Sequence, residues 1–178
     1  MALHELPAEG DAEPAGAEPA LDPELRLQHA LDLAYRHLGR RARTVAEVRA
    51  HLEDKLVEAE TVERALVELE RAGYLDDADY ARRFAEDRRT LDAWGPARIE
   101  RRLLEVGVEP GLVARALADR EAADDRAAAA ELLVRRFPAG LLTDRDRGRA
   151  LGVLVRKGYD LEQAHDAIRA YARDDVTF

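Results

Sequence analysis

The stretch GYLDDADYARRFAEDRRTLDAWGPARI, residues Gly73–Ile99, decides the fold of this chain. Gly73 can adopt the left-handed conformation that ends a helix, and the apolar Tyr74–Leu75 can fold back on its last turn. Asp76–Asp77 then offers a side-chain oxygen to cap a following helix, and its negative charge suits the positive helix N-terminus. Gly95–Pro96 marks another helix start, because proline at the first helical position needs no amide hydrogen. The stretch therefore predicts two helical units joined end to end.

Helix starts of the same kind occur on both sides of this stretch. Upstream, Asp22–Pro23 predicts a helix that ends at Gly39, Thr44–Glu47 forms a capping box, and Thr61 is expected to cap a third helix. Downstream, further helices are predicted to start at Pro110, to run from about Asp124 to Phe137, and to follow the caps Thr143 and Asp160. These signals predict nine helices and no sheet.

The apolar stripes of the predicted helices recur every 51 residues. Leu52, Leu103 and Leu154 follow one another at this spacing, as do Leu66, Leu117 and Ile168, and Val62, Val113 and Ala164. A sustained period of this size is typical of stacked helical repeats. We expect an all-α protein of three tandem three-helix repeats in an elongated curved array, with units at 23–75, 76–120 and 121–178. One compact bundle of nine helices stays open as the alternative.

The composition argues against an enzyme. The 178 residues include no cysteine, serine or asparagine, so disulfides and thiolate metal sites are excluded and the usual covalent nucleophiles reduce to five threonines, of which Thr44, Thr61 and Thr143 are expected to cap helices. No histidine pair has zinc-enzyme spacing, no glycine-rich phosphate loop occurs, and the cluster Asp76, Asp77 and Asp79 lacks the glycine and distal glutamate of a calcium loop. We expect no catalytic residue, metal or cofactor. The chain also lacks an apolar run long enough for a membrane span and a signal-peptide pattern, which favours a cytoplasmic protein.

The net charge of −9 is unevenly distributed. Residues 1–24 contain seven acidic and no basic residues, so the rest of the chain carries only −2. Residues 1–22 are mostly Ala, Glu, Pro and Gly, a composition that cannot offset the entropy of ordering, and we expect a disordered acidic tail there. The tail is either an inert extension or a mimic of nucleic-acid charge.

Arginines, which make up 26 of the 28 basic residues, form clusters in the body of the chain. Residues 82–102 contain seven arginines against four acids, and helical spacing places Arg98, Arg101 and Arg102 on one face. Such clusters are either solvated faces paired with nearby acids or one side of the array that meets a negatively charged partner. The second hypothesis gives these partner-binding or nucleic-acid-binding candidates: Arg82, Arg83, Arg88, Arg89, Arg98, Arg101, Arg102, Arg135, Arg136, Arg156 and Lys157.

Another set of residues is expected to shape the helix ends and the contacts between repeats. It consists of Gly73, Tyr74, Leu75, Asp76, Asp77, Trp94, Gly95, Pro96, Ile99, Gly107 and Gly158. Trp94, the single tryptophan, is expected to pack in the core or between repeats rather than to stack on a base.

Four segments of the chain resemble the RecX family of bacterial regulatory proteins. They are GYLDDADYARRF at 73–84, WGPARIERRLLEVGV at 94–108, RARTVAEV at 41–48 and RKGYDLEQAHDAI at 156–168. The order and spacing of the four are more specific than any one of them. Thr44 stands where the family usually has serine, and Tyr80 where it often has phenylalanine.

The resemblance implies a negative modulator of the RecA recombinase. Such proteins lie in the groove of the RecA nucleoprotein filament, block its extension, and suppress ATP hydrolysis and strand exchange, which restrains homologous recombination and DNA repair. It implies two partners, the filament and the single-stranded DNA within it. We expect a monomer, because the apolar stripes are consumed within the repeats.

Two other functions stay open on the sequence alone. The corners between helices, such as Gly107–Pro110, are compatible with a helix-turn-helix protein that acts directly on DNA. A helical interaction scaffold without any nucleic-acid role is the third possibility. The acidic pI of about 5.1 predicts only modest, salt-sensitive affinity for DNA alone.

Overall fold

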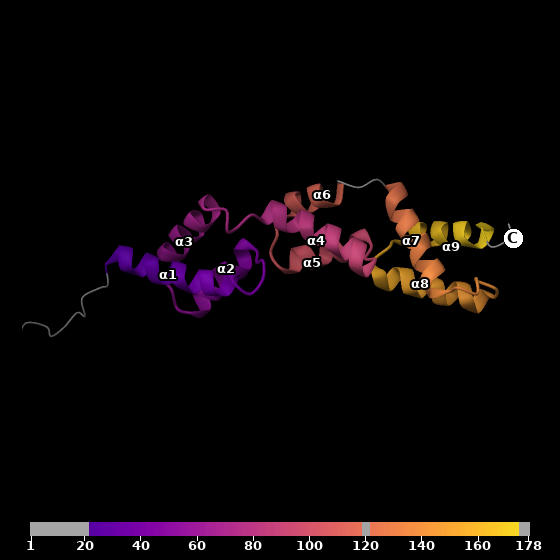
Figure 1. The fold of residues 1–178 in the computed structure, drawn as a ribbon, viewed down its shortest axis with the longest axis horizontal. Coiled ribbons are helices and arrows are strands. Elements are labelled where there is room, and N and C mark those ends of the chain that lie inside the picture. The colour runs from indigo at the N-terminus through magenta and orange to yellow at the C-terminus, as the bar shows by residue number, and fades with distance from the viewer. Residues whose placement is uncertain (1–21, 119–121, 175–178) are drawn as a thin grey trace, which may run out of the picture.

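The computed structural model describes residues 22–118 and 122–174, which fold into nine helices without a strand. The helices are α1 (Pro23–Leu38), α2 (Val45–Asp54), α3 (Ala59–Arg71), α4 (Asp77–Asp92), α5 (Pro96–Glu105), α6 (Pro110–Ala118), α7 (Ala122–Arg136), α8 (Asp144–Lys157) and α9 (Leu161–Asp174). Figure 1 shows them in three groups of three along one long axis.

Each group of three helices surrounds its own hydrophobic core. One cluster of buried side chains belongs to α1–α3 and the adjoining Leu75, a second to α4–α6 and a third to α7–α9. The 51-residue register is visible in these cores, because Leu52, Leu103 and Leu154 are each completely buried. The prediction of tandem three-helix repeats is therefore confirmed, and the compact nine-helix alternative is wrong.

Most of the predicted tail and one predicted boundary between units fall outside the described residues. The acidic tail predicted at 1–22 lies there except for its last residue, Asp22, which caps α1 by accepting a hydrogen bond from the Glu24 amide. The predicted boundary between the second and third units, at residue 120, lies in the undescribed segment 119–121. The extent of each unit stays a proposal.

Side-chain caps set most of the helix starts, with one correction. Thr44 and Thr143 form complete capping boxes, and Asp76 caps α4 by accepting from the Asp79 amide. The prediction that Thr61 caps α3 is wrong: α3 begins at Ala59, so Thr61 lies within its first turn, where it is only 4% exposed. A small β-branched residue on the core side of a helix packs there, and its capping potential goes unused.

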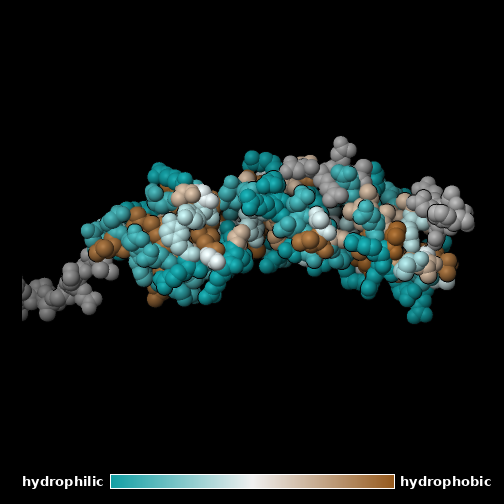
Figure 2. Space-filling view, in the orientation of Figure 1, coloured by the Kyte–Doolittle hydropathy of each residue, from teal (hydrophilic) through white to brown (hydrophobic). Residues whose placement is uncertain are grey.

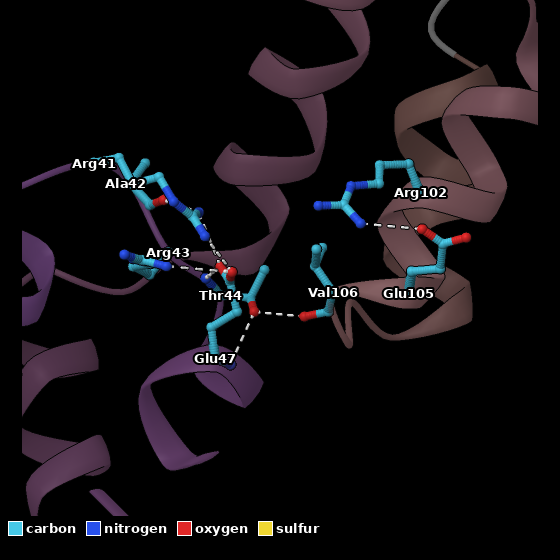
Figure 3. A network of polar contacts seen from close by, with 8 residues as sticks. All are labelled: Arg41, Ala42, Arg43, Thr44, Glu47, Arg102, Glu105 and Val106. Carbon is cyan, nitrogen blue, oxygen red and sulfur yellow. Dashed lines mark hydrogen bonds and ion pairs between the residues drawn. The ribbon is translucent and has the colours of Figure 1, made fainter. Parts of the chain in front are cut away.

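The first and second units meet where the N-terminus of α2 faces the C-terminal turn of α5. The Thr44 hydroxyl donates a hydrogen bond of 2.6 Å to the Val106 carbonyl, and the Val45 amide donates to the Asp77 carboxylate at 3.0 Å. Gly107 has φ +83° and lies so close to Ala46 that a Cβ on the glycine would be 2.3 Å from the Ala46 Cβ. Figure 3 shows the Thr44–Val106 contact in its setting. This arrangement is called the first junction below.

The second and third units meet in the same way, one repeat further on. The amide of Gly95, the N-cap of α5, donates to the Lys157 carbonyl at 2.8 Å, and the Ala97 amide donates to the Gly158 carbonyl at 3.2 Å. Lys157 and Gly158 follow Val106 and Gly107 by 51 residues. In both junctions the positive end of one helix faces the negative end of another, which is the favourable orientation of the helix dipoles. The array is thus built from one contact used twice.

We expect Thr44→Val to destabilise the protein by about 2–4 kcal/mol. The substitution removes an N-cap, which contributes about 1 kcal/mol, and leaves the partly buried Val106 carbonyl without this donor, which costs about 1–3 kcal/mol. Urea denaturation followed by circular dichroism measures the effect. Thr44→Ser, which keeps the hydroxyl, is the control and should lose far less. Equal losses in the two variants would show that the hydroxyl does not stabilise this junction.

Candidate anion-binding interface

A groove rich in arginine runs over the boundary between the second and third units. It consists of two adjoining hollows of about 500 Å³ each, which share Arg136, Val153 and Arg156. Its basic lining residues are Arg98, Arg136, Arg149, Arg156 and Lys157, and the described residues contribute no carboxylate to its lining. We call these five residues and the floor between them the basic groove.

Three helices supply the basic residues. Arg136 is the last residue of α7, and Arg156 and Lys157 form the end of α8, so the negative ends of two helices favour their positive charges. Arg98 comes from α5, where its guanidinium lies 4.1 Å from the Trp94 ring centre and donates a hydrogen bond of 3.1 Å to the Arg156 carbonyl. The groove exists because the second junction brings α5 against the end of α8.

The charges of the groove are only partly neutralised by the protein itself. Arg149 pairs with Asp146 at 2.5 Å, and the Lys157 ammonium donates to the Asp92 carbonyl. Within the part of the chain that the structure describes, neither Arg136 nor Arg156 takes part in an ion pair, although both side chains are exposed. Two exposed guanidinium groups beside an apolar floor can bind phosphate or carboxylate in the bidentate manner that arginine favours.

Some of the other predicted binding residues are committed to partners outside this groove. Arg82 and Arg83 share Asp79 at 2.6 and 2.7 Å, whereas Arg101 and Arg102 both pair with Glu105. These pairs are exposed and contribute at most about 1 kcal/mol each, so a partner could displace them at little cost.

The remaining predicted residues have different surroundings. Arg88 pairs with Asp92 at 2.5 Å and lies against the rings of Phe84 and Trp94. Arg89 is buried and donates to the Leu117 carbonyl, so it supports the packing of α4 on α6 and is not accessible to a partner. Arg135 is exposed on α7. The structure thus gathers only Arg98, Arg136, Arg156 and Lys157 of the predicted set.

Residues outside the predicted set contribute to the groove and to the junctions. Arg149 lines the groove, and Thr44, Val106 and Ala46 make the first junction. The sequence did carry a signal for the junctions, since the helix-ending Gly107 and Gly158 are one repeat apart. The 51-residue spacing does not indicate which arginines of different units lie close to one another.

The first junction carries its own charge network, in which the charges are balanced. Glu47 pairs with Arg41 at 2.5 Å and with Arg43 at 3.6 Å, beside the Thr44 cap (Figure 3). Burial opposes ionisation of Glu47, but hydrogen bonds from Arg41 and the Thr44 amide, with the charges of both arginines, hold the pKa of its carboxyl below the ordinary value. At the same junction, burial raises the pKa of Asp77. Because acids and arginines match here, this surface is less suited to an anion than the basic groove.

Among the described residues, no group of three histidine or acidic side chains could hold a metal ion. None of the described helices is long and apolar enough to cross a membrane.

Comparison with known proteins identifies the architecture. Two family models match, "RecX, first three-helix domain" at residues 30–69 and "RecX, second three-helix domain" at residues 76–117. The regulatory protein RecX of Deinococcus radiodurans is 36% identical over 166 residues, which span 93% of this chain and 78% of that protein. The RecX of Amycolatopsis mediterranei is 31% identical, over 86% of this chain and 89% of that protein.

Solved structures agree on the fold. The crystal structure of RecX from Lactobacillus salivarius superposes with a TM-score of 0.73 at 18% identity, over 83% of this chain and 97% of that one. A further crystal structure of a regulatory protein RecX gives a TM-score of 0.68 at 21% identity, over 83% and 73% of the two chains. With its helical repeats and its close sequence relatives, the chain belongs to the RecX family of regulatory proteins.

Proposed function

We propose that this protein is a negative regulator of homologous recombination and DNA repair that binds the RecA nucleoprotein filament. It inhibits the ATPase activity and strand exchange of the filament and limits filament growth, and it has no enzymatic activity of its own. Its place of action is the cytoplasm, where this target lies. The observation that carries the proposal is the basic groove, with Arg136 and Arg156 exposed and unpaired in the described structure.

The distribution of charge favours a filament over free DNA as the partner. A protein that reads duplex DNA by itself is usually strongly basic, whereas this chain has a net charge of −9. Its cationic surface is a local groove on an elongated array, which suits a partner that presents phosphates and protein surface together. Single-stranded DNA within the filament provides the phosphates, and the acidic side chains of the recombinase can meet the exposed arginines of α4 and α5.

Inhibition follows if the protein binds one geometry of the filament better than another. The two junctions fix the spacing of the three units through close glycine contacts and hydrogen bonds, which involve side chains in the first junction and backbone atoms alone in the second. A rigid array that spans neighbouring subunits fits one subunit spacing better than others. Because a ligand shifts a conformational equilibrium only by its differential affinity, such an array biases the filament toward the spacing that it fits.

A DNA-stimulated RecA ATPase assay tests the proposal directly. We expect hydrolysis to fall as the protein is added to preformed filaments on single-stranded DNA. Unchanged hydrolysis at a stoichiometric amount of protein would contradict the proposal. Fluorescence anisotropy with labelled single- and double-stranded DNA, repeated over a salt series, should show weak and salt-sensitive binding. Tight binding to duplex DNA without RecA would instead support a DNA-binding protein that acts alone.

A further inference from the structure

Each end of the described array carries residues that correspond to one side of a junction but have no neighbouring unit to contact. Inside the array, the left-handed residue after a second helix, Gly107 or Gly158, contacts the first turn of the preceding unit's second helix, at Ala46 or Ala97–Arg98. By the 51-residue register, Leu56 of the first unit corresponds to Gly107 and Gly158 but has no preceding unit to contact. Gly148 of the third unit corresponds to Ala46 and Ala97, although it lies in the second turn of α8 because that helix begins at Asp144.

Leu56 is an unusual residue for its position. It has φ +59° and its side chain is 92% exposed. A leucine in the left-handed region is strained, and glycine would adopt the same conformation without strain. An exposed isobutyl group gains nothing from packing in the isolated chain. Packing within the chain therefore does not explain this residue, and its side chain is accessible to another molecule.

The opposite end of the array has a groove whose size and apolar floor suit a leucine side chain. A groove of about 640 Å³ between α8 and α9 has an apolar floor of Gly148, Leu151, Ile168 and Ala172. A Cβ added to Gly148 would meet no atom within 4 Å, so space is open directly above it. Figure 2 shows that hydrophilic side chains cover most of the visible face, with small apolar patches that include some over this end of the molecule.

The residues at the two ends are complementary in size. In the first junction, glycine at the left-handed position faces alanine, whereas the free ends carry leucine at one and glycine at the other. The start of α8 differs as well, because its N-cap is Thr143, three residues before the position that the register assigns to it. We expect the additional residues at the start of α8 to keep a docked helix end further away, by a distance that a leucine side chain can span and a glycine cannot.

The two ends are also complementary in charge. Residues 53–60 around Leu56 contain Glu53, Asp54, Glu58 and Glu60 against the single Lys55. The groove is lined by Arg147, His165 and Arg169 in addition to its apolar floor, and none of the lining residues that the structure describes is a carboxylate. Arg147 and Arg169 pair with Asp144 and Asp166, which do not line the groove. From these observations we propose that the α8–α9 groove binds Leu56 of a second copy of this chain, so that arrays join head to tail.

This contact differs from a symmetric dimer in a way that can be measured. Its two halves lie on different surfaces of one molecule, so each copy keeps one free half and the association is open-ended. The monomer expected from the sequence assumes that the apolar stripes, with Leu56 as the last member of the second helix's stripe, are consumed within the repeats. The structure corrects this for Leu56, because α2 ends at Asp54 and Leu56 is 92% exposed. Under the alternative interpretation, Leu56 prevents another unit from docking, because the junction requires a glycine at this position.

Sedimentation equilibrium of the full chain over a wide concentration range tests the proposal. We expect the weight-average mass to rise with concentration toward and beyond twice the monomer mass, and to fall when salt is added. Leu56→Asp and Leu56→Gly should each abolish the rise, since both remove the side chain that fills the groove. Leu91→Asp is the matched control, because Leu91 on α4 is also exposed, at 74%, and should not affect association.

A mixing experiment then distinguishes a head-to-tail contact from any other. Gly148→Leu fills the groove while leaving Leu56 intact, so it should be monomeric alone, and an unchanged circular dichroism spectrum checks its fold. A mixture of Gly148→Leu and Leu56→Asp restores one working contact and should form dimers but nothing larger. A wild-type mass independent of concentration, stronger association of Leu56→Gly, or a mixture that stays monomeric would each overturn the proposal. None of these measurements involves RecA, so they stand apart from the proposed function.

Discussion

Gly158→Ala is expected to lower the free energy of unfolding by about 2–5 kcal/mol and to disrupt the second junction. Gly158 has φ +93°, and a Cβ there would be 2.4 Å from the Arg98 Cβ and 2.6 Å from the Arg98 amide nitrogen. The left-handed conformation costs alanine about 1–2 kcal/mol, and overpacking against a backbone atom adds about 1–3 kcal/mol. Urea denaturation followed by circular dichroism measures the loss.

Gly73→Ala provides the matched control. Gly73 also follows a helix and has φ +74°, but a Cβ there would meet no atom within 4 Å. This variant should therefore show the conformational cost alone, about 1–2 kcal/mol. Similar losses in the two variants would mean that the close approach of Gly158 to Arg98 adds nothing to stability.

The sole tryptophan reports where Gly158→Ala acts. Trp94 lies beneath the Arg98 guanidinium at the second junction, so separation of the second and third units should alter its fluorescence before either unit unfolds. The control at Gly73 lies at the end of α3 and should leave the emission of the folded protein unchanged. An altered emission with retained helicity would show that the junction opens while the helices persist.

The helices could be predicted from the sequence because local chemistry determines where they end. Helix starts lie at Thr44, Thr143 and Asp76, whose side chains accept hydrogen bonds from the free amides of the first turn. Several helix ends are followed by glycines, which adopt the left-handed conformation readily. Capping potential alone does not determine a helix start: Thr61 is suited to capping but lies within the first turn of α3. The spacing of 51 residues predicted the repeats because each core needs large apolar residues at the same positions.

The candidate site could be predicted only in part, because it depends on how units meet. Arg98 and Arg156 are 58 residues apart and lie together through contacts of Gly95 and Gly158 backbone atoms, which leave no side-chain signal. For the same reason, Arg98, Arg101 and Arg102 share a helical face but do not form one site. Arg98 contacts the third unit, whereas Arg101 and Arg102 pair with Glu105. Helical periodicity places residues on a face but does not determine which neighbour covers it.

The double variant Arg136→Gln and Arg156→Gln is expected to raise the protein concentration needed for half-maximal inhibition of the RecA ATPase by at least about tenfold. Each hydrogen-bonded contact to a charged group contributes about 1.5–3 kcal/mol, and the loss of even one such contact exceeds tenfold in affinity. Neither arginine belongs to a hydrophobic core or an ion pair among the described residues, so helicity and thermal stability should be retained. Titration of the ATPase with each variant measures the shift.

Arg64→Gln with Arg71→Gln makes the control for net charge. Both arginines lie on α3 in the first unit, are exposed and are paired with Glu24 and Glu68, and neither lines the basic groove. This variant loses the same two charges and should inhibit nearly as well as the wild type. Equal losses in the two double variants would mean that long-range charge, rather than the basic groove, determines binding. Arg136→Lys with Arg156→Lys separates the remaining alternatives: it keeps the charge but loses the planar fork, so intermediate inhibition would indicate bidentate contact with phosphate or carboxylate.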